Sequence, residues 1–271
     1  PRDVGVAGMK DRHAVTRQWI SLPPPVAPEQ VTALALEDVT VLEAARHNHK
    51  LRTGHVRANR FVLRVRDAVP DAEARARAIL DVLAKAPGAP NWYGEQRFGR
   101  AGDNAAKGRD IVMGGKPPRD KKLARLFVSA LQSELFNQWL VARMTDGLYA
   151  RVLAGDVLHK VGGGMFTCED AATDEARLLA GELVVTGPMF GDRMRAAAGD
   201  ASAREEAVLA AAGLARDSFA SVRAIAEGTR RDATIQVGEP SVAAADGTLE
   251  VRFTLPGGAY ATAVMREVMK C

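Results

Sequence analysis

The sequence has strand-like patterns towards both of its ends and helix-like periodicity between them. Residues 60–66 alternate between arginines and apolar residues, and residues 249–255 alternate again near the C-terminus, as half-buried strands do. From about residue 104 to residue 227 the chain is rich in alanine and places apolar residues at helical spacing. A sheet completed from both ends of the chain, and interrupted by a helical block, is the fold that this pattern favours.

We therefore predict an α+β protein in which a mixed, largely antiparallel sheet with helices is built from residues 1–99 and 228–271. A mainly helical insertion spans residues 100–227. The expected strands are 14–20, 39–45, 60–66, 233–237 and 249–255, and the expected helices are 71–86, 121–144, 169–182, 202–212, 219–227 and 262–269. Asp246-Gly247 is a strong turn signal, and residues 162–164, three glycines, indicate a flexible turn.

Composition excludes several classes of protein. The 271 residues carry a net charge of +4 and only two cysteines and five histidines, and none of these residues has metal-ligand spacing. No long uncharged apolar run could span a bilayer. We therefore expect a cytoplasmic protein without a metal or a membrane segment. The positive charge is compatible with an anionic partner such as a nucleic acid.

One carboxylate lies between two cations near the N-terminus. Asp11 follows Lys10 and precedes Arg12 in the stretch from Ala7 to Trp19, and opposite charges this close favour an ionised carboxylate. An anionic acid at the mouth of a strand is suited to act as a nucleophile. The alternative from the residues alone is a solvated surface turn.

The segment between Glu43 and Asp67 contains no acid. It carries seven basic residues, which are Arg46, Lys50, Arg52, Arg57, Arg60, Arg64 and Arg66. Such a segment attracts phosphates, and its affinity for them falls as salt rises. The alternative is a solvated surface without a ligand, but the absence of any compensating acid favours nucleic acid.

The Asp11 motif, Ala7-Gly8-x-Lys10-Asp11-Arg12-x-Ala14-x-Thr16-x-Gln18, resembles the signature of the TruD family of tRNA pseudouridine synthases. Four further stretches resemble the other motifs of that family, in the family's order. They are Asn59–Phe61, Pro90–Gly99, Ser133–Asn137, and Leu255–Thr262 followed by Arg266-Glu267. The resemblance covers nearly the whole chain, and five ordered motifs are far more specific than one.

The resemblance implies a pseudouridine synthase fold with a TruD-type insertion domain at residues 100–227. It also implies a reaction that isomerises uridine, at position 13 of tRNA, to pseudouridine without a cofactor or metal. Asp11 would be the nucleophile, attacking either C1′ of the sugar or C6 of the uracil. Asn59 and Phe61 would hold the uracil, and Lys10 would either hold phosphate or keep Asp11 anionic. The expected RNA-binding residues are Arg12, Arg46, Lys50, Arg52, Arg57 and Arg97, and we expect a monomer.

Three alternatives remain open at the level of the sequence. Phe61 has the pattern of an ordinary core residue on a strand. The basic surface would equally serve an RNA-binding protein without activity. A hydrolase with a carboxylate nucleophile and a small substrate would also use Asp11, but it should lack the acid-free basic segment.

The family has a strand-rich segment before the aspartate motif, whereas this sequence starts at Pro1, almost at that motif. An exposed sheet edge next to Val4 would invite aggregation unless it were covered. We therefore expect this sequence to be a fragment that lacks part of the pocket wall.

Overall fold

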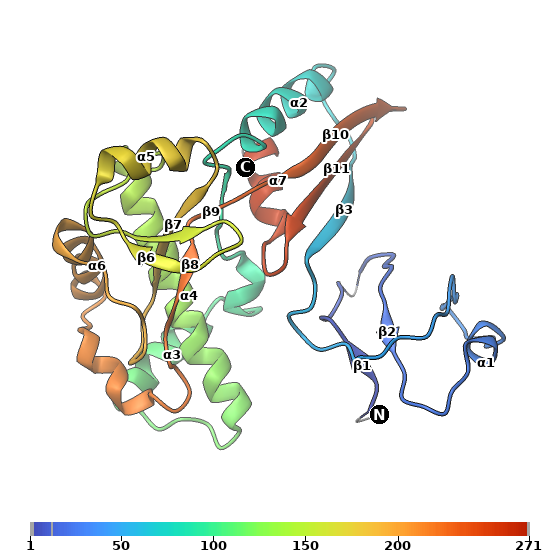
Figure 1. The fold of residues 1–271 in the computed structure, drawn as a ribbon, viewed down its shortest axis with the longest axis horizontal. Helices are drawn as coiled ribbons and strands as arrows, with labels where there is room; N and C mark the ends of the chain where they lie inside the picture. The colour runs from blue at the N-terminus through green and yellow to red at the C-terminus, as the bar shows by residue number, and fades with distance from the viewer. Residues whose placement is uncertain (1–2, 12, 270–271) are drawn as a thin grey trace. The chain divides into compact units, whose positions relative to one another are not determined.

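The structure is a computed structural model that describes residues 3–11 and 13–269. The chain divides into two compact units, Pro1–Asn59 and Arg60–Cys271, which we call the N-terminal unit and the C-terminal unit. No helix among the described residues is long and apolar enough to cross a membrane. Figure 1 shows the elements of both units in chain order.

The N-terminal unit contains little regular structure. Strand β1 (Gly5–Val6) pairs antiparallel with β2 (Ile20–Ser21), and a short helix, α1, covers Pro28–Thr32. The Ser21 hydroxyl accepts a hydrogen bond from the Leu51 amide at 2.9 Å. Gly5 is packed so closely that a Cβ there would lie 2.4 Å from the Leu51 carbonyl oxygen, so only glycine fits. The start of the aspartate segment is thus tied to residues near 51.

The prediction of strands at residues 14–20 and 39–45 is wrong. Of these residues, Ile20 alone lies in a strand, as the first residue of β2. Residues 15–19 and 40–45 are irregular, and the later segment makes one isolated bridge, Leu36 with Val39. Strand propensity reflects packing on a pleated surface rather than an intrinsic backbone preference. Because these segments find no ladder partner within their unit, their β-branched residues do not form strands.

The C-terminal unit contains a three-stranded sheet in the order β10-β11-β3. Strand β3 (Ala58–Val65) begins at the unit boundary, and β10 (Gly238–Ala245) pairs antiparallel with β11 (Thr248–Pro256). The alternation of β3 is as predicted, with Phe61, Leu63 and Val65 packed on the core. The predicted turn is also confirmed, since Asp246 and Gly247 both have positive φ, at 51° and 71°.

Two helices, α2 (Ala72–Leu83) and α7 (Ala261–Met269), cover this sheet on one side (Figure 1). Both helices were predicted, α2 from its periodicity. Helix α2 contacts β10 and α7, and Leu80, Val251, Phe253 and Val264 are fully buried between these elements. Two-residue strands β4 (Ala89–Pro90) and β9 (Thr234–Ile235) pair nearby, and the 3-10 helix η1 (Glu95–Phe98) follows β4.

A second core of this unit surrounds the long helix α4 (Lys121–Thr145). Helices α3 (Asn104–Val112), α5 (Ala171–Leu179) and α6 (Gly199–Ala211) and the 3-10 helix η2 (Arg216–Val222) complete the helical part. An antiparallel sheet in the order β6-β5-β7-β8 packs beside α4. Its strands are β5 (Val157–Lys160), β6 (Met165–Thr167), β7 (Leu183–Met189) and β8 (Thr229–Asp232).

Helices α4, α5 and α6 were predicted, but α3 and the sheet of this block were not. Strands β5 and β6 are short, at four and three residues, and too brief to give a clear alternation. Residues 219–227 are also not the expected α-helix, because η2 ends at Val222. The helical spacing of residues 121–144 predicts that Leu123 and Leu126 lie in the core, but they are 39% and 40% exposed. The domain limits at residues 99 and 228 remain a prediction.

Candidate functional site

The structure brings together two of the predicted site residues in the N-terminal unit. The Lys10 ammonium donates a hydrogen bond to Asn59 Oδ1 at 2.7 Å, across 49 residues of sequence. A second contact, from the Gly54 amide to the Ala7 carbonyl at 3.2 Å, holds the start of the motif. The aspartate motif and the Asn59 motif, distant in sequence, are therefore neighbours in space.

Asp11 is exposed and forms no hydrogen bond or ion pair with the described residues of the chain. Its carboxylate is therefore free to meet a substrate, while the adjacent Lys10 is held by Asn59. Arg12, the other cation of the motif, lies outside the described residues. An exposed carboxylate that makes no hydrogen bond or ion pair with the described residues is accessible to a substrate, and the role of Asp11 as a nucleophile stays a prediction.

The basic segment separates into two parts. Arg46, Arg52 and Arg57 are exposed and make no ion pair with any described residue, and Lys50 is exposed as well. On β3, by contrast, Arg60 pairs with Glu239 at 2.6 Å and Arg64 pairs with Glu250 at 3.3 Å. Although the segment itself contains no acid, Glu239 on β10 and Glu250 on β11 pair with two of its arginines in the folded chain.

Phe61 is half-buried in the C-terminal unit. Its ring lies 5.8 Å from that of Phe253, with 38° between the planes, and it packs against the core of the β10-β11-β3 sheet. The core interpretation of Phe61 therefore holds for one side of the ring. Contact of the ring with uracil stays a prediction.

Three other motifs meet at α4 in the C-terminal unit. The Tyr93 amide donates to Asn137 Oδ1 at 2.9 Å, and the Asn137 side chain donates back to the Tyr93 carbonyl at 3.0 Å. The rings of Tyr93 and Tyr260 are 6.0 Å apart in an edge-on arrangement. The segments Pro90–Gly99, Ser133–Asn137 and Leu255–Thr262 thus form one assembly.

Arg97 belongs to this assembly. Its Nε donates to the Ser133 hydroxyl at 3.1 Å, and its Nη2 donates to the Ser129 hydroxyl. The guanidinium lies 5.5 Å from the centre of the Tyr93 ring. Two of its donor groups are therefore used within the protein, and a contact of Arg97 with RNA stays a prediction.

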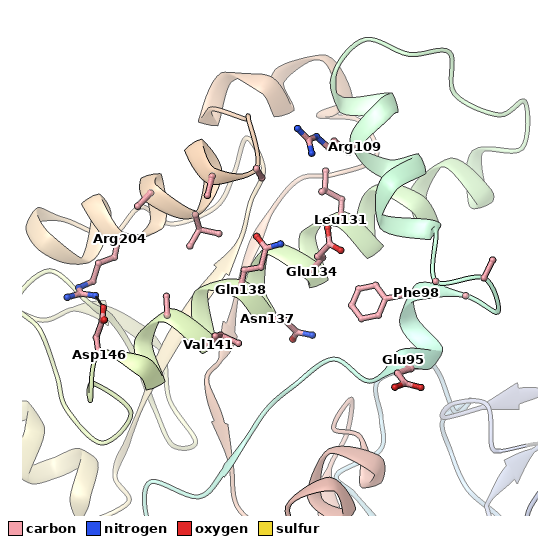
Figure 2. Close-up of a pocket in the computed structure, with 18 of the residues that line it drawn as sticks. Glu95, Phe98, Arg109, Leu131, Glu134, Asn137, Gln138, Val141, Asp146 and Arg204 are labelled. Carbon is pink, nitrogen blue, oxygen red and sulfur yellow. Dashed lines mark hydrogen bonds and ion pairs between the residues drawn. The ribbon is translucent and has the colours of Figure 1, made fainter. Parts of the chain in front are cut away.

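An open groove of about 1230 Å³ lies beside the assembly, lined by η1, α3, α4 and α6. Figure 2 shows Phe98 on one side, Glu134, Asn137 and Gln138 along α4, and the ion pair of Arg204 and Asp146 at one end. Its lining includes three acids and three arginines, so it is not a uniformly basic channel. Among residues 3–11 and 13–269, no group of three or more acid, histidine or cysteine side chains could hold a metal ion.

Sequence reasoning missed one residue of the assembly, Arg231. Its guanidinium contacts Asn91, Gly258 and the face of the Tyr93 ring. It lies in none of the five motifs, and no pattern in the sequence distinguishes it from the adjacent Arg230.

The comparisons with known proteins agree with the motifs. The family model described as tRNA pseudouridine synthase D (TruD) matches residues 1–116 and 119–268. A tRNA pseudouridine synthase D from Anaeromyxobacter dehalogenans is 51% identical over 276 residues, covering 99% of this chain and 78% of the relative. The protein of the same name from Thermus thermophilus is 42% identical, covering 99% and 74%.

A crystal structure of a TruD protein from Methanosarcina mazei aligns with a TM-score of 0.80 over 100% of this chain and 82% of that chain. The two sequences are 24% identical, so this likeness concerns the fold. It supports the predicted α+β architecture. With the family match and the close relatives, it confirms the resemblance seen in the motifs, and the chain therefore belongs to the TruD family.

Proposed function

We propose that the chain converts uridine in tRNA to pseudouridine, with Asp11 as the nucleophile. Family membership supports the reaction, because the close relatives are named tRNA pseudouridine synthase D. The observation that supports the role of Asp11 is the hydrogen bond between Lys10 and Asn59 at 2.7 Å, which joins two motifs. Asp11 follows Lys10 in the chain, and its exposed carboxylate makes no hydrogen bond or ion pair with the described residues.

The reaction is an isomerisation. The bond from C1′ to N1 of the uracil breaks, a bond from C1′ to C5 forms, C5 loses its hydrogen as a proton, and N1 gains one. The target nucleotide first leaves its stack, because its reacting atoms are not accessible within a helix. Asp11 then forms a covalent intermediate, by attack at C1′ or at C6, and both routes remain open.

Each other residue has a proposed role that follows from its position. Lys10, fixed by Asn59, supplies a positive charge within the aspartate motif that can hold a phosphate. The exposed arginines at positions 46, 52 and 57, with Lys50 and Arg12, contact the RNA backbone, and Arg97 contacts RNA from the other unit. Asn59 and Phe61 hold the uracil by hydrogen bonding and ring contact.

We also propose the finer properties of the enzyme. The substrate uridine is at position 13, and the enzyme is a cytoplasmic monomer. No redox cofactor is required, because the reaction moves no electrons to or from an external acceptor, and the proposed mechanism uses no metal. Residues 1–99 and 228–271 form the catalytic domain, and residues 100–227 form the insertion.

The test is incubation of the chain with unmodified tRNA, followed by mapping of pseudouridine along the product. The proposal predicts one modified position, more than one turnover per enzyme and full activity after dialysis against a chelator. RNA that is bound but unmodified would instead identify an RNA-binding protein without activity. Absence of both binding and modification would favour a small-substrate enzyme.

A further inference from the structure

Two adjacent arginines on β8 have opposite environments. Arg230 makes an ion pair with Glu205 at 2.7 Å, and both side chains are almost completely buried, at 2% and 1% exposure. Its Nε and Nη2 also donate to the Thr186 hydroxyl at 3.1 Å and the Thr186 carbonyl at 2.6 Å. Arg230 is therefore a buried, paired charge of the kind that fixes a core.

Arg231 has no carboxylate within ion-pair distance among the described residues. Its Nη2 donates to Asn91 Oδ1 at 2.5 Å and its Nε donates to the Asn91 carbonyl at 3.3 Å. Burial lowers the pKa of Arg231, and the nearby Tyr93 and Tyr260 partly offset this effect. A largely desolvated guanidinium whose hydrogen-bond partners are neutral groups is costly to fold around.

The face of the same guanidinium lies on Tyr93. The Cζ atom of the Arg231 guanidinium is 3.9 Å from the centre of the Tyr93 ring. The Nη2 atom also donates a hydrogen bond of 3.5 Å to the Gly258 carbonyl. The planar guanidinium thus donates hydrogen bonds to Asn91 and Gly258 and stacks on the Tyr93 ring. Gly258 belongs to the loop that carries Tyr260. Lysine cannot reproduce this set, because its ammonium is a compact point charge without a plane.

These contacts join segments that the chain keeps far apart. Asn91 and Tyr93 belong to the Pro90–Gly99 motif, which is tied to α4 through Asn137. Gly258 and Tyr260 belong to the Leu255–Thr262 motif. Arg231 therefore links the two motifs that carry the Tyr93 and Tyr260 rings, which lie 6.0 Å apart.

We propose that Arg231 is a positioning residue for the tRNA reaction, holding the Tyr93 and Tyr260 rings in the single arrangement that receives the RNA. This inference rests on the proposed function. Arg231 acts through the two tyrosines and the Gly258 loop. Loosening it misplaces bound RNA, and small misplacements reduce rates strongly.

The experiment compares the full chain with Arg231→Lys and with the matched variant Arg230→Lys on its neighbour. For each we measure the melting temperature, the affinity for unmodified tRNA as a function of salt, and the single-turnover rate at saturating enzyme. We expect Arg231→Lys to lower that rate about tenfold or more, with the slope of log affinity against log salt unchanged. Arg230→Lys should lower the melting temperature while its folded fraction reacts at the wild-type rate.

A second variant, Tyr93→Leu, tests the same contact from the other side and covers the case in which Arg231→Lys folds poorly. The inference predicts a similar rate loss in Tyr93→Leu, and no further loss in the double variant, because both changes break one contact. Rates that fall only in proportion to the unfolded fraction, or additive losses, would overturn the positioning role. A salt slope reduced by about one unit in Arg231→Gln, which removes the charge, would also overturn it, since that marks a phosphate contact. If the unmutated chain forms no pseudouridine in tRNA, the proposed function itself is refuted.

Discussion

The two units of the molecule differ in how their residues are packed. Among the described residues of the N-terminal unit, Gly5 alone is buried, and large apolar side chains such as Met9, Val15 and Leu42 are exposed. The C-terminal unit has two cores built around β11 and α4. The candidate nucleophile therefore lies in the unit with the least packing. The residues proposed to act in the reaction are thus divided between the units, whereas the buried hydrophobic clusters lie in the C-terminal unit.

The largest expected effect is on turnover in the N-terminal unit. Asp11→Asn keeps the size of the side chain but makes a poor nucleophile, so turnover should fall about a thousandfold or more. The melting temperature should stay close to wild type, because Asp11 makes no hydrogen bond or ion pair with the described residues. The tRNA affinity should also stay close to wild type, because asparagine has nearly the same size. Steady-state kinetics with unmodified tRNA and a thermal melt measure both.

Asp38→Asn is the matched control for this change. Asp38 is an exposed acid of the same unit and has a positive φ of 59°, a conformation that asparagine tolerates. It should retain full activity. Residual activity of Asp11→Asn within a few-fold of wild type would remove Asp11 from the mechanism.

The next effect is on stability, and it compares the units directly. Leu140 is fully buried on α4, so Leu140→Ala should lower the free energy of unfolding by about 2–5 kcal/mol. Leu42 is 63% exposed in the N-terminal unit, and Leu42→Ala should cost less than about 0.5 kcal/mol. Denaturant titrations measure both losses. Equal losses would show that the N-terminal unit has a core that its exposure does not reveal.

The next prediction concerns Phe61, which packs on the core of the C-terminal unit and is also proposed to contact the uracil. Replacing it should therefore change both stability and turnover. Phe61→Leu should cost about 1 kcal/mol of stability through the lost contact with Phe253. The uracil contact predicts, in addition, a clear loss of turnover at a temperature where the variant is fully folded. Full activity with a lowered melting point would leave Phe61 a core residue only.

The smallest expected effect concerns charge. Replacing Arg52 and Arg57 together by glutamine should reduce the slope of log affinity against log salt by about one unit. The matched change of Arg60 and Arg64 should have less effect, because Glu239 and Glu250 already neutralise those two. A titration series in salt measures the slopes. Equal slopes in both double variants would show that pairing on β3 does not matter for RNA binding.

The sequence predicted those elements whose pattern is long or whose turn chemistry is strong. The alternation at Phe61, the periodicity of α4 and the Asp246-Gly247 turn all have clear local causes. The sheet containing β5 and β6 was missed because its short strands depend on pairing with β7, a tertiary effect. The strands expected in the N-terminal unit failed for the same reason, since propensity without a partner does not form a strand.

For the site, the motifs named Lys10 and Asn59, and the structure joined them at 2.7 Å. No sequence pattern pointed to Arg231, because its importance depends on three segments that meet only in the fold. The acids that pair with Arg60 and Arg64 could not be identified from the sequence either, since Glu239 and Glu250 lie 179 and 186 residues further along the chain. Contacts between distant segments are what a linear reading lacks.

The most direct test of the account follows the hydrogen at C5, which must leave the uracil when C5 bonds to the sugar. Unmodified tRNA with tritium at C5 of its uridines is mixed with excess enzyme, so that all RNA is bound. We predict that the wild-type chain and Asp38→Asn release tritium from one uridine per tRNA, whereas Asp11→Asn binds the same RNA and releases none. Release at the wild-type rate by Asp11→Asn, or no release by the wild-type chain, would contradict the account.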